Sequence, residues 1–135
     1  MKKFDDRTSQ AILRTLRENG RISWQELGKA VHLSGQAAAE RVRQMQDAGV
    51  IDGFTVRESR LPRHFISVAM KHTDFTAFEA MVSTDPNVES LDKTSGDACY
   101  LIVYRTASNE ELEAFLNRLL PHGGYRLASS LRRVR

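Results

Sequence analysis

Apolar residues near the start of the chain recur at intervals of three and four, which is the spacing typical of helices. Ile12, Leu13 and Leu16 predict a first helix, and Asp5 or Asp6 stands where its N-terminal cap is expected. This one-sided pattern predicts a helix that buries one face and exposes the other.

Two further helices follow at short intervals. Ser23 and Glu26 have the spacing of a capping box, which predicts a helix of about two turns over residues 23–31. A third helix is predicted from Ser34 to Ala48, with Gly49 as its left-handed stop. The inward stripe predicted for this third helix consists of Ala38, Val42 and Met45.

The segment that follows predicts a strand and then a domain boundary. Asp52-Gly53 is a turn signal that leads into the short run Phe54–Arg57, which is typical of a strand. Three helices and a strand outline a winged helix-turn-helix domain over residues 1–60, linker included. Pro62, flanked by arginines, interrupts strand pairing and marks the start of a second domain over residues 61–135.

The second domain alternates between strand and helix patterns. Strands are predicted over residues 65–70, 88–95, 98–104 and 125–134, and helices over residues 75–82 and 108–119. Residues 98–104 are apolar on both faces, which predicts a central strand. The order βαββαβ is that of a ferredoxin-like domain, so the fold class is α+β.

Composition limits the classes of protein to consider. The chain has 135 residues, of which 41% are hydrophobic and 27% charged, as in a folded soluble protein of one ordinary or two small domains. Its longest apolar run, residues 98–104, is far shorter than the roughly 20 residues of a membrane helix. No apolar stretch follows the basic start, so we expect a cytoplasmic protein without a membrane partner.

Charge is unevenly distributed between the two domains. The net charge of +3 resides entirely in residues 1–60, whereas residues 61–135 balance to zero. A basic first domain with a helix-turn-helix pattern favours double-stranded DNA as its partner. The alternative is that the three helices form a protein-interaction module.

The second helix of a helix-turn-helix enters the major groove, and its N-terminal residues meet base edges. At that tip Ser34 offers a hydroxyl, Gln36 an amide that can pair with adenine, and Ala37 a methyl group suited to thymine. Arg43 is expected to reach phosphate, whereas Arg41 either does the same or pairs with a carboxylate on Glu40 or a neighbouring helix. The candidate DNA-binding residues are Arg21, Ser23, Ser34, Gln36, Ala37, Glu40, Arg41, Arg43 and Gln44.

The first domain contains an ordered motif that comprises Arg21-Ile22-Ser23, Glu26-Leu27-Gly28, Leu33-Ser34, Arg41-Val42, Met45 and Gly49-Val50-Ile51. This motif resembles that of the Lrp/AsnC family of bacterial and archaeal transcription regulators. The second domain resembles the RAM-type ligand-sensing and assembly domain of the same family. The resemblance implies a transcription regulator without enzymatic activity, which assembles as a homodimer or as a larger oligomer, a tetramer or an octamer.

The resemblance also implies an effector loop at Gly96, Asp97, Ala98, Cys99 and Tyr100. In the family this loop contacts a small amino acid through backbone groups and acidic side chains at a subunit interface. Cys99 stands where the family often has a second aspartate. Either Asp97 replaces that partner of the ligand's ammonium, or a different effector binds, or none does.

Other functions have weaker support in the sequence. An effector-independent protein that wraps or bridges DNA is the main alternative, and Cys99 favours it. Tetrapyrrole decarboxylases resemble the same fold, but no cluster for several carboxylates is present. The four histidines (His32, His64, His72 and His122) lack metal-ligand spacing, and a lone cysteine excludes a multi-cysteine zinc site, so we expect neither metal nor cofactor.

Overall fold

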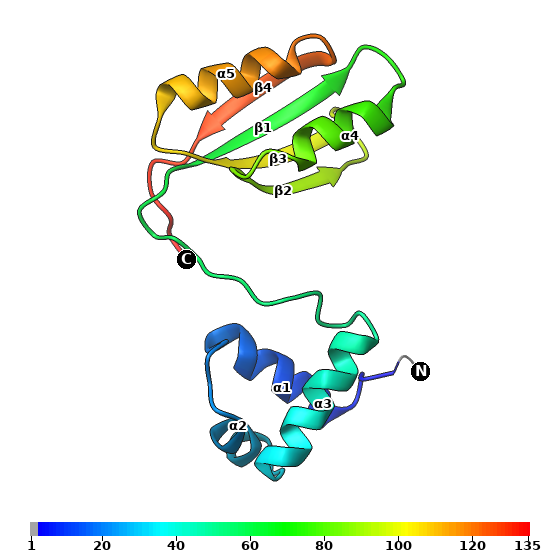
Figure 1. Cartoon of the computed structure of the whole chain (residues 1–135), viewed down its shortest axis with the longest axis vertical. Helices are drawn as coiled ribbons and strands as arrows, with labels where there is room; N and C mark the ends of the chain where they lie inside the picture. The colour runs from blue at the N-terminus through cyan, green and yellow to red at the C-terminus, as the bar shows by residue number, and fades with distance from the viewer. Residues whose placement is uncertain (1–2) are drawn as a thin grey trace. The chain divides into compact units, whose positions relative to one another are not determined.

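The computed structural model describes residues 3–135 and comprises two compact units, which meet between Arg57 and Glu58 (Figure 1). The first unit consists of three helices: α1 (Arg7–Glu18), α2 (Trp24–Val31) and α3 (Gly35–Asp47). Each begins at a side-chain cap, because an oxygen of Asp6, Ser23 or Ser34 accepts the N–H of the residue three positions later. The three predicted helices are therefore confirmed.

The core of the first unit lies between these helices. The predicted stripe of α3 is confirmed, since Ala38, Val42 and Met45 are completely buried. Ile12 of α1 and Leu27 of α2 are completely buried against it. The apolar spacing read from the sequence thus places one side of α3 in the core and leaves the opposite side exposed.

The predicted wing strand is wrong. Residues 52–57 form extended chain without a ladder partner, and Phe54 and Val56 are 53% and 75% exposed. A strand needs a second strand to pair its backbone groups, and residues 3–57 supply none. The first unit is a helix-turn-helix unit without a wing.

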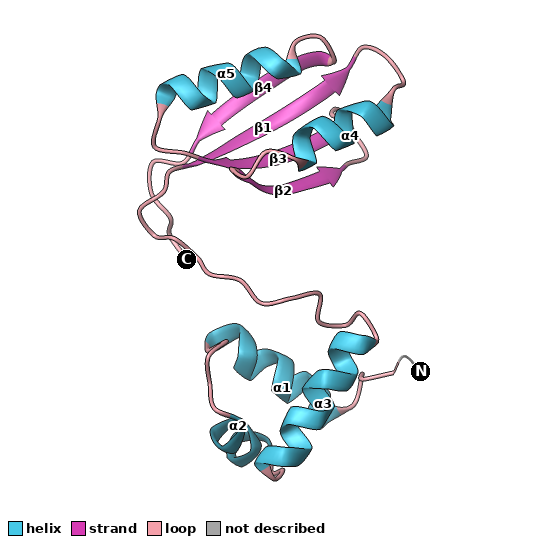
Figure 2. Ribbon diagram, viewed as in Figure 1, coloured by secondary structure: helices cyan, strands magenta, loops and turns pink. Residues whose placement is uncertain are grey.

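The second unit is a four-stranded antiparallel sheet with two helices (Figure 2). Its elements are β1 (Arg63–Met70), α4 (Phe75–Ser83), β2 (Val88–Lys93), β3 (Tyr100–Arg105), α5 (Asn109–Leu119) and β4 (Gly123–Ser129). The strand order β2-β3-β1-β4 confirms the ferredoxin-like βαββαβ arrangement and the central position of β3.

All four strands differ from the prediction at a boundary: β1 begins at Arg63 rather than at residue 65, and β2 ends at Lys93 rather than at residue 95. β3 begins at Tyr100 rather than Ala98, because Thr94 Oγ1 donates to the Ala98 carbonyl at 2.8 Å and holds residues 94–99 in a bend. β4 covers residues 123–129 rather than 125–134, since its partner β1 begins at Arg63 and offers no backbone groups beyond it. Leu131 is consequently fully exposed.

Both helices of the second unit pack on one face of the sheet. Ile66 and Val68 of β1 and Ile102 of β3 are fully buried beneath them, together with Phe78 of α4 and Phe115 of α5. The side chains that alternate with these point to the opposite face, which neither helix covers. The sheet is therefore covered by helices on one face only.

Candidate nucleic-acid interface and ligand loop

A short turn joins α2 to α3 and fixes how the two helices cross. His32 ends α2 in the left-handed conformation with φ of 62°, and the Leu33 N–H donates to the Gly28 carbonyl at 2.8 Å. Gly28 packs directly against this turn: a Cβ added there would lie 2.5 Å from the Leu33 carbonyl oxygen. Only glycine permits this approach, so Gly28 is a structural requirement to which the sequence alone assigned no role.

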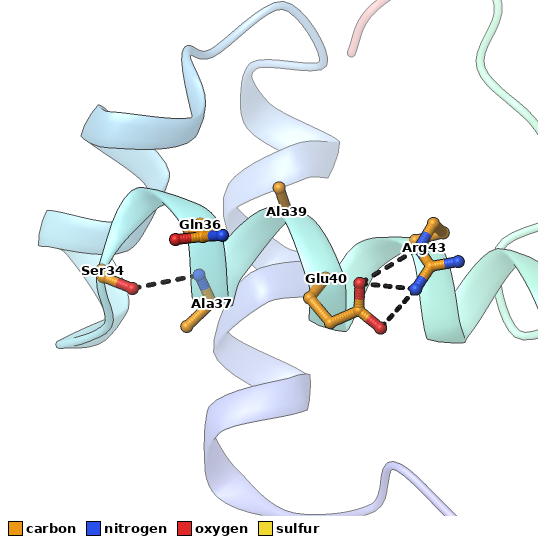
Figure 3. A pocket seen from close by; sticks show the side chains of 6 residues that line it. All are labelled: Ser34, Gln36, Ala37, Ala39, Glu40 and Arg43. Atoms are coloured by element: carbon orange, nitrogen blue, oxygen red, sulfur yellow. Dashed lines mark hydrogen bonds and ion pairs between the residues drawn. The ribbon is translucent and has the colours of Figure 1, made fainter.

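The exposed side of α3 forms an open depression (Figure 3). Its lining residues are Ser34, Gln36, Ala37, Ala39, Glu40 and Arg43. All except Ala39 are sequence-predicted candidates for DNA contact, and the structure brings them together on one surface. Gln44 is also exposed and adjoins Glu40, with its Nε2 at 3.4 Å from Glu40 Oε1.

Glu40 and Arg43 form a two-pronged ion pair in this depression (Figure 3). Arg43 Nε donates to Glu40 Oε2 at 3.0 Å, and Arg43 Nη2 donates to both carboxylate oxygens, reaching Oε2 at 2.6 Å. Hydrogen bonds from Arg43 lower the pKa of the Glu40 carboxyl. The exposed face of α3 therefore presents a paired anion and cation rather than a free cation.

Arg41 lies on another side of α3 and contacts α1. Its Nη1 donates to Ser9 Oγ at 2.9 Å and to Asp6 Oδ2 at 3.2 Å. Hydrogen bonds from Ser9 lower the pKa of the Asp6 carboxyl, and the Arg41 charge adds to that effect. Of the two roles that the sequence left open for Arg41, this geometry favours the ion pair with a neighbouring helix.

Arg21 and Ser23 lie at the start of α2, where both are exposed. The Ser23 hydroxyl caps the helix by accepting the Glu26 N–H at 3.1 Å. The structure does not place either residue in the depression on α3. They instead surround a helix N-terminus, whose free N–H groups favour anions.

In the predicted ligand loop, Gly96 adopts a positive φ of 106° and Asp97 is exposed. The Cys99 N–H donates to the Val68 carbonyl at 2.8 Å and is thus used by the sheet. Tyr100 belongs to β3 and its side chain is fully buried on the helix-covered face, where burial raises its pKa. The exposed part of the loop is therefore Gly96 and Asp97, with Ala98 and Cys99 half-buried.

The fold brings together two histidines that are distant in sequence. His72 Nε2 lies 3.2 Å from His122 Nδ1, and the Asp74 N–H donates to His72 Nδ1. That bond requires a lone pair on His72 Nδ1, so the proton of the neutral ring lies on Nε2 and points at His122. Among residues 3–135 no group of three or more possible ligands is arranged to hold a metal ion.

Comparisons with known proteins match both units. The AsnC-type helix-turn-helix domain matches residues 6–46, and the Lrp/AsnC ligand binding domain matches residues 63–131. The chain belongs to the Lrp/AsnC family. In keeping with this, its fold of a helix-turn-helix unit followed by a βαββαβ unit is that of solved Lrp/AsnC structures.

Individual members of the Lrp/AsnC family resemble the chain over nearly its whole length. HTH-type transcriptional regulator LrpB of Bacillus subtilis is 33% identical over 132 residues, which cover 92% of this chain and 87% of the relative. The structure of B. subtilis LrpC superposes with a TM-score of 0.82 at 26% identity and covers 100% and 99% of the two chains. This Lrp/AsnC protein is a transcriptional regulator with a DNA-binding and a ligand-binding domain.

One solved relative is described with a small ligand. Transcriptional regulator NMB0573 from Neisseria meningitidis, in complex with L-Met, has a TM-score of 0.79 and 28% identity, covering 96% of this chain and 92% of its own. Within the described residues of the present Lrp/AsnC protein, no helix is long and apolar enough to cross a membrane.

Proposed function

We propose that this regulator binds double-stranded DNA through the exposed face of α3. Gln36, Ala37 and Glu40 contact base edges in the major groove, with Ser34 and Gln44 at the two ends of the same surface. The observation that carries this proposal is the open depression on α3, which adjoins the turn held by Gly28. The buried stripe of α3 fixes which side of the helix can face a duplex.

Phosphate affinity is assigned to Arg21 and to the N-terminus of α2. Arg21 is exposed, and among residues 3–135 no carboxylate lies within ion-pair distance of its guanidinium. Each phosphate contact contributes about 0.9 to the slope of log affinity against log salt. Arg21→Ala should therefore weaken binding to every duplex. It should also reduce the magnitude of that slope by about 0.9, the contribution of one phosphate contact.

The test is fluorescence anisotropy with random duplexes at two salt concentrations. Lys71→Ala is a matched control, because it removes one exposed positive charge from the second unit. A slope that is unchanged in Arg21→Ala, or that falls equally in both variants, contradicts the role of Arg21. Wild-type protein that binds no duplex contradicts the whole assignment.

We propose that the ligand is a small amino acid held at the loop of residues 96–100. The Asp97 carboxylate would pair with the ligand's ammonium, and N–H groups of the bend at Gly96 would hold its carboxylate. The family's ligand-binding domain and the L-Met complex of the Neisseria relative support this proposal. Against it, the amide of Cys99 is occupied and its side chain is no carboxylate.

Isothermal titration with a panel of amino acids tests the effector. We expect at least one to bind wild-type protein, binding to be lost in Asp97→Asn, and the exposed control Glu113→Gln to behave as wild type. Unchanged binding by Asp97→Asn contradicts the role of Asp97. Failure of every amino acid to bind favours the effector-independent DNA-architectural function instead.

The uncovered face of the sheet supports self-assembly into a homodimer. Phe65 of β1 lies there between Val103 of β3 and Ala128 of β4. The next row of paired residues across the sheet on this face, called a rung below, consists of Asp92, Leu101, Ser67 and Arg126. Leu101 is 37% exposed in the isolated chain. Phe65, Leu101 and Val103 form an apolar strip on the two central strands, and burial of such a strip against a partner is favourable.

Charge indicates how two copies would face each other. Asp92 on edge strand β2 and Arg126 on edge strand β4 belong to the same rung. A two-fold axis parallel to the strands places β2 of one copy over β4 of the other, so that each Asp92 meets an Arg126. We infer an isologous dimer, from which tetramers or octamers can be built.

Val103→Glu tests the dimer by placing a charge at the centre of this face. The variant should be monomeric in sedimentation velocity, whereas Thr76→Glu, on the exposed side of α4, should assemble as wild type does. Circular dichroism checks that both variants fold. An unchanged sedimentation coefficient for Val103→Glu contradicts this interface.

We infer that the protein acts in the cytoplasm as a regulator without a catalytic activity of its own. Its relatives are named as transcriptional regulators, which supports this inference. Titration with haem-like tetrapyrroles tests the enzymatic alternative on the same fold. A Soret band that saturates at one ligand per chain contradicts the purely regulatory function.

A further inference from the structure

Both guanidinium groups of α3 are paired with carboxylates of the first unit. Arg41 is held by Asp6 at 3.2 Å, and Arg43 is held by Glu40 through three hydrogen bonds. The surface offered to DNA is consequently neutral at its centre. This is unexpected for a DNA-reading helix, because attraction between phosphates and free cations supplies most non-specific affinity.

We propose that Glu40 is a specificity-determining residue, which fixes Arg43 so that the pair reads a C·G base pair. The inference rests on the proposed function, in which the exposed face of α3 contacts base edges. It assigns Arg43 to base recognition in place of the phosphate contact that the sequence favours.

The hydrogen-bonding capacity of the pair matches that base pair. Arg43 uses Nε and Nη2 on the carboxylate, which leaves Nη1 to donate to guanine O6. Apart from Arg43, Glu40 has one weak partner, Gln44 Nε2 at 3.4 Å, which the amino group of the paired cytosine can displace as donor. Cytosine N4 and guanine O6 lie side by side in the major groove, as do the two side chains.

The carboxylate also discriminates against wrong partners. Phosphate oxygens, guanine N7 and thymine O4 are acceptors, so a carboxylate that faces any of them is repelled. Because Glu40 holds Arg43, the guanidinium is not free to swing to the nearest phosphate. Removal of Glu40 should therefore convert a selective contact into a non-selective one.

The experiment compares binding of the full-length protein to two duplexes at two salt concentrations. The preferred duplex is first selected from a randomised pool with wild-type protein, and the second has its contacted C·G pair replaced by T·A. Glu40→Ala should bind the two duplexes with about tenfold less discrimination than wild type, bind random DNA more tightly, and have a salt slope steeper by about one contact.

Three further variants separate the pair from net charge. Glu18→Ala removes an exposed carboxylate at the end of α1 and should raise affinity for all duplexes without loss of discrimination. Adding Arg43→Ala to Glu40→Ala should return the salt slope to its wild-type value. Glu40→Gln keeps the size of the side chain and should lose discrimination as Glu40→Ala does.

Each outcome decides the inference. Equal effects of Glu40→Ala and Glu18→Ala, or discrimination retained in Glu40→Gln, overturn it. Circular dichroism of each variant checks that α3 is still folded, which is expected because Glu40 is exposed. A wild-type protein that binds no duplex overturns the proposed function itself, whereas a wild type that binds DNA without preference at a C·G pair overturns only the role of Glu40.

Discussion

Replacing Gly28 by alanine is the sharpest test of the helix-turn-helix geometry. The new Cβ would lie 2.5 Å from the Leu33 carbonyl oxygen and 2.9 Å from both the carbonyl carbon and the oxygen of Ser34. These are backbone atoms, so no side-chain rotation can relieve the contact. The turn must move away from α2, and α3, which begins immediately after it, must move with it.

The expected cost follows from two opposing effects. Overpacking a tight contact costs typically 1–3 kcal/mol, whereas alanine in place of glycine inside a helix gains about 1 kcal/mol. Because the obstructing atoms are backbone, we place the steric cost at the upper end of its range. We therefore expect Gly28→Ala to destabilise the first unit by about 1–2 kcal/mol, and to weaken DNA binding by displacing α3.

Urea unfolding followed by tryptophan fluorescence measures this loss. Trp24 is the single tryptophan of the chain and lies on α2, so its emission reports on the first unit alone. At a slope of about 1 kcal/mol per molar urea, the midpoint should fall by about 1–2 M. Gly20→Ala is the control, because its Cβ would lie 3.7 Å from the nearest atom, an ordinary contact.

The reasoning fails if Gly28→Ala unfolds at the wild-type urea concentration or above it. Such a result would mean that the turn has room for a methyl group and that Gly28 is no requirement for the crossing of α2 and α3. Equal losses in the two glycine variants would point to a general effect of glycine replacement rather than to this contact.

Three more measurements test individual contacts. Asp6→Ala should lower the thermal midpoint of the first unit at neutral pH. Hydrogen bonds from Ser9 lower the pKa of this carboxyl, so its contribution to stability is present above the unfolded-state pKa and is lost as pH falls through the folded-state pKa. The thermal midpoints of the variant and the wild type should therefore converge in acid. Ser108→Ala removes the cap of α5 and should cost about 1 kcal/mol of stability in the second unit, measured by thermal unfolding followed by circular dichroism; an unchanged midpoint contradicts the capping role of Ser108. In carboxyl-detected NMR, the Glu40 pKa, which hydrogen bonds from Arg43 lower, should rise in Arg43→Ala, and an unmoved titration would show that the pair does not persist in solution.

Local patterns in the sequence were sufficient to predict the helices of the first unit and the order of elements in the second. Helix starts depend on a cap and on a backbone N–H three residues away, as at Ser23 and Ser34, so local sequence contains the information. The apolar period of α3 likewise identified its buried side, and hence which candidates are exposed. The motif that resembles the Lrp/AsnC family lies within the same segment of the sequence, residues 21–51.

Strand limits depended on partners that lie far along the chain. Residues 54–57 have the composition of a strand but find no ladder, and Ala98 and Cys99 are drawn into a bend by Thr94. Backbone N–H and C=O groups gain from extended structure only where another strand meets them. The pattern of apolar residues along one strand does not show where its pairing with the neighbouring strand ends.

The candidate site likewise has features that the sequence predicts and features that depend on how the helices pack. The helix period of α3 predicted that Gln36, Ala37 and Glu40 lie on its exposed face, and they do. The ion pair between Arg41 and Asp6, which lie 35 positions apart, could not be predicted in this way, because it arises from the packing of α1 on α3. The sequence gives the number of ionic groups and their net charge. The distances between those groups depend on the fold, and they determine which charges form ion pairs and which remain available to DNA.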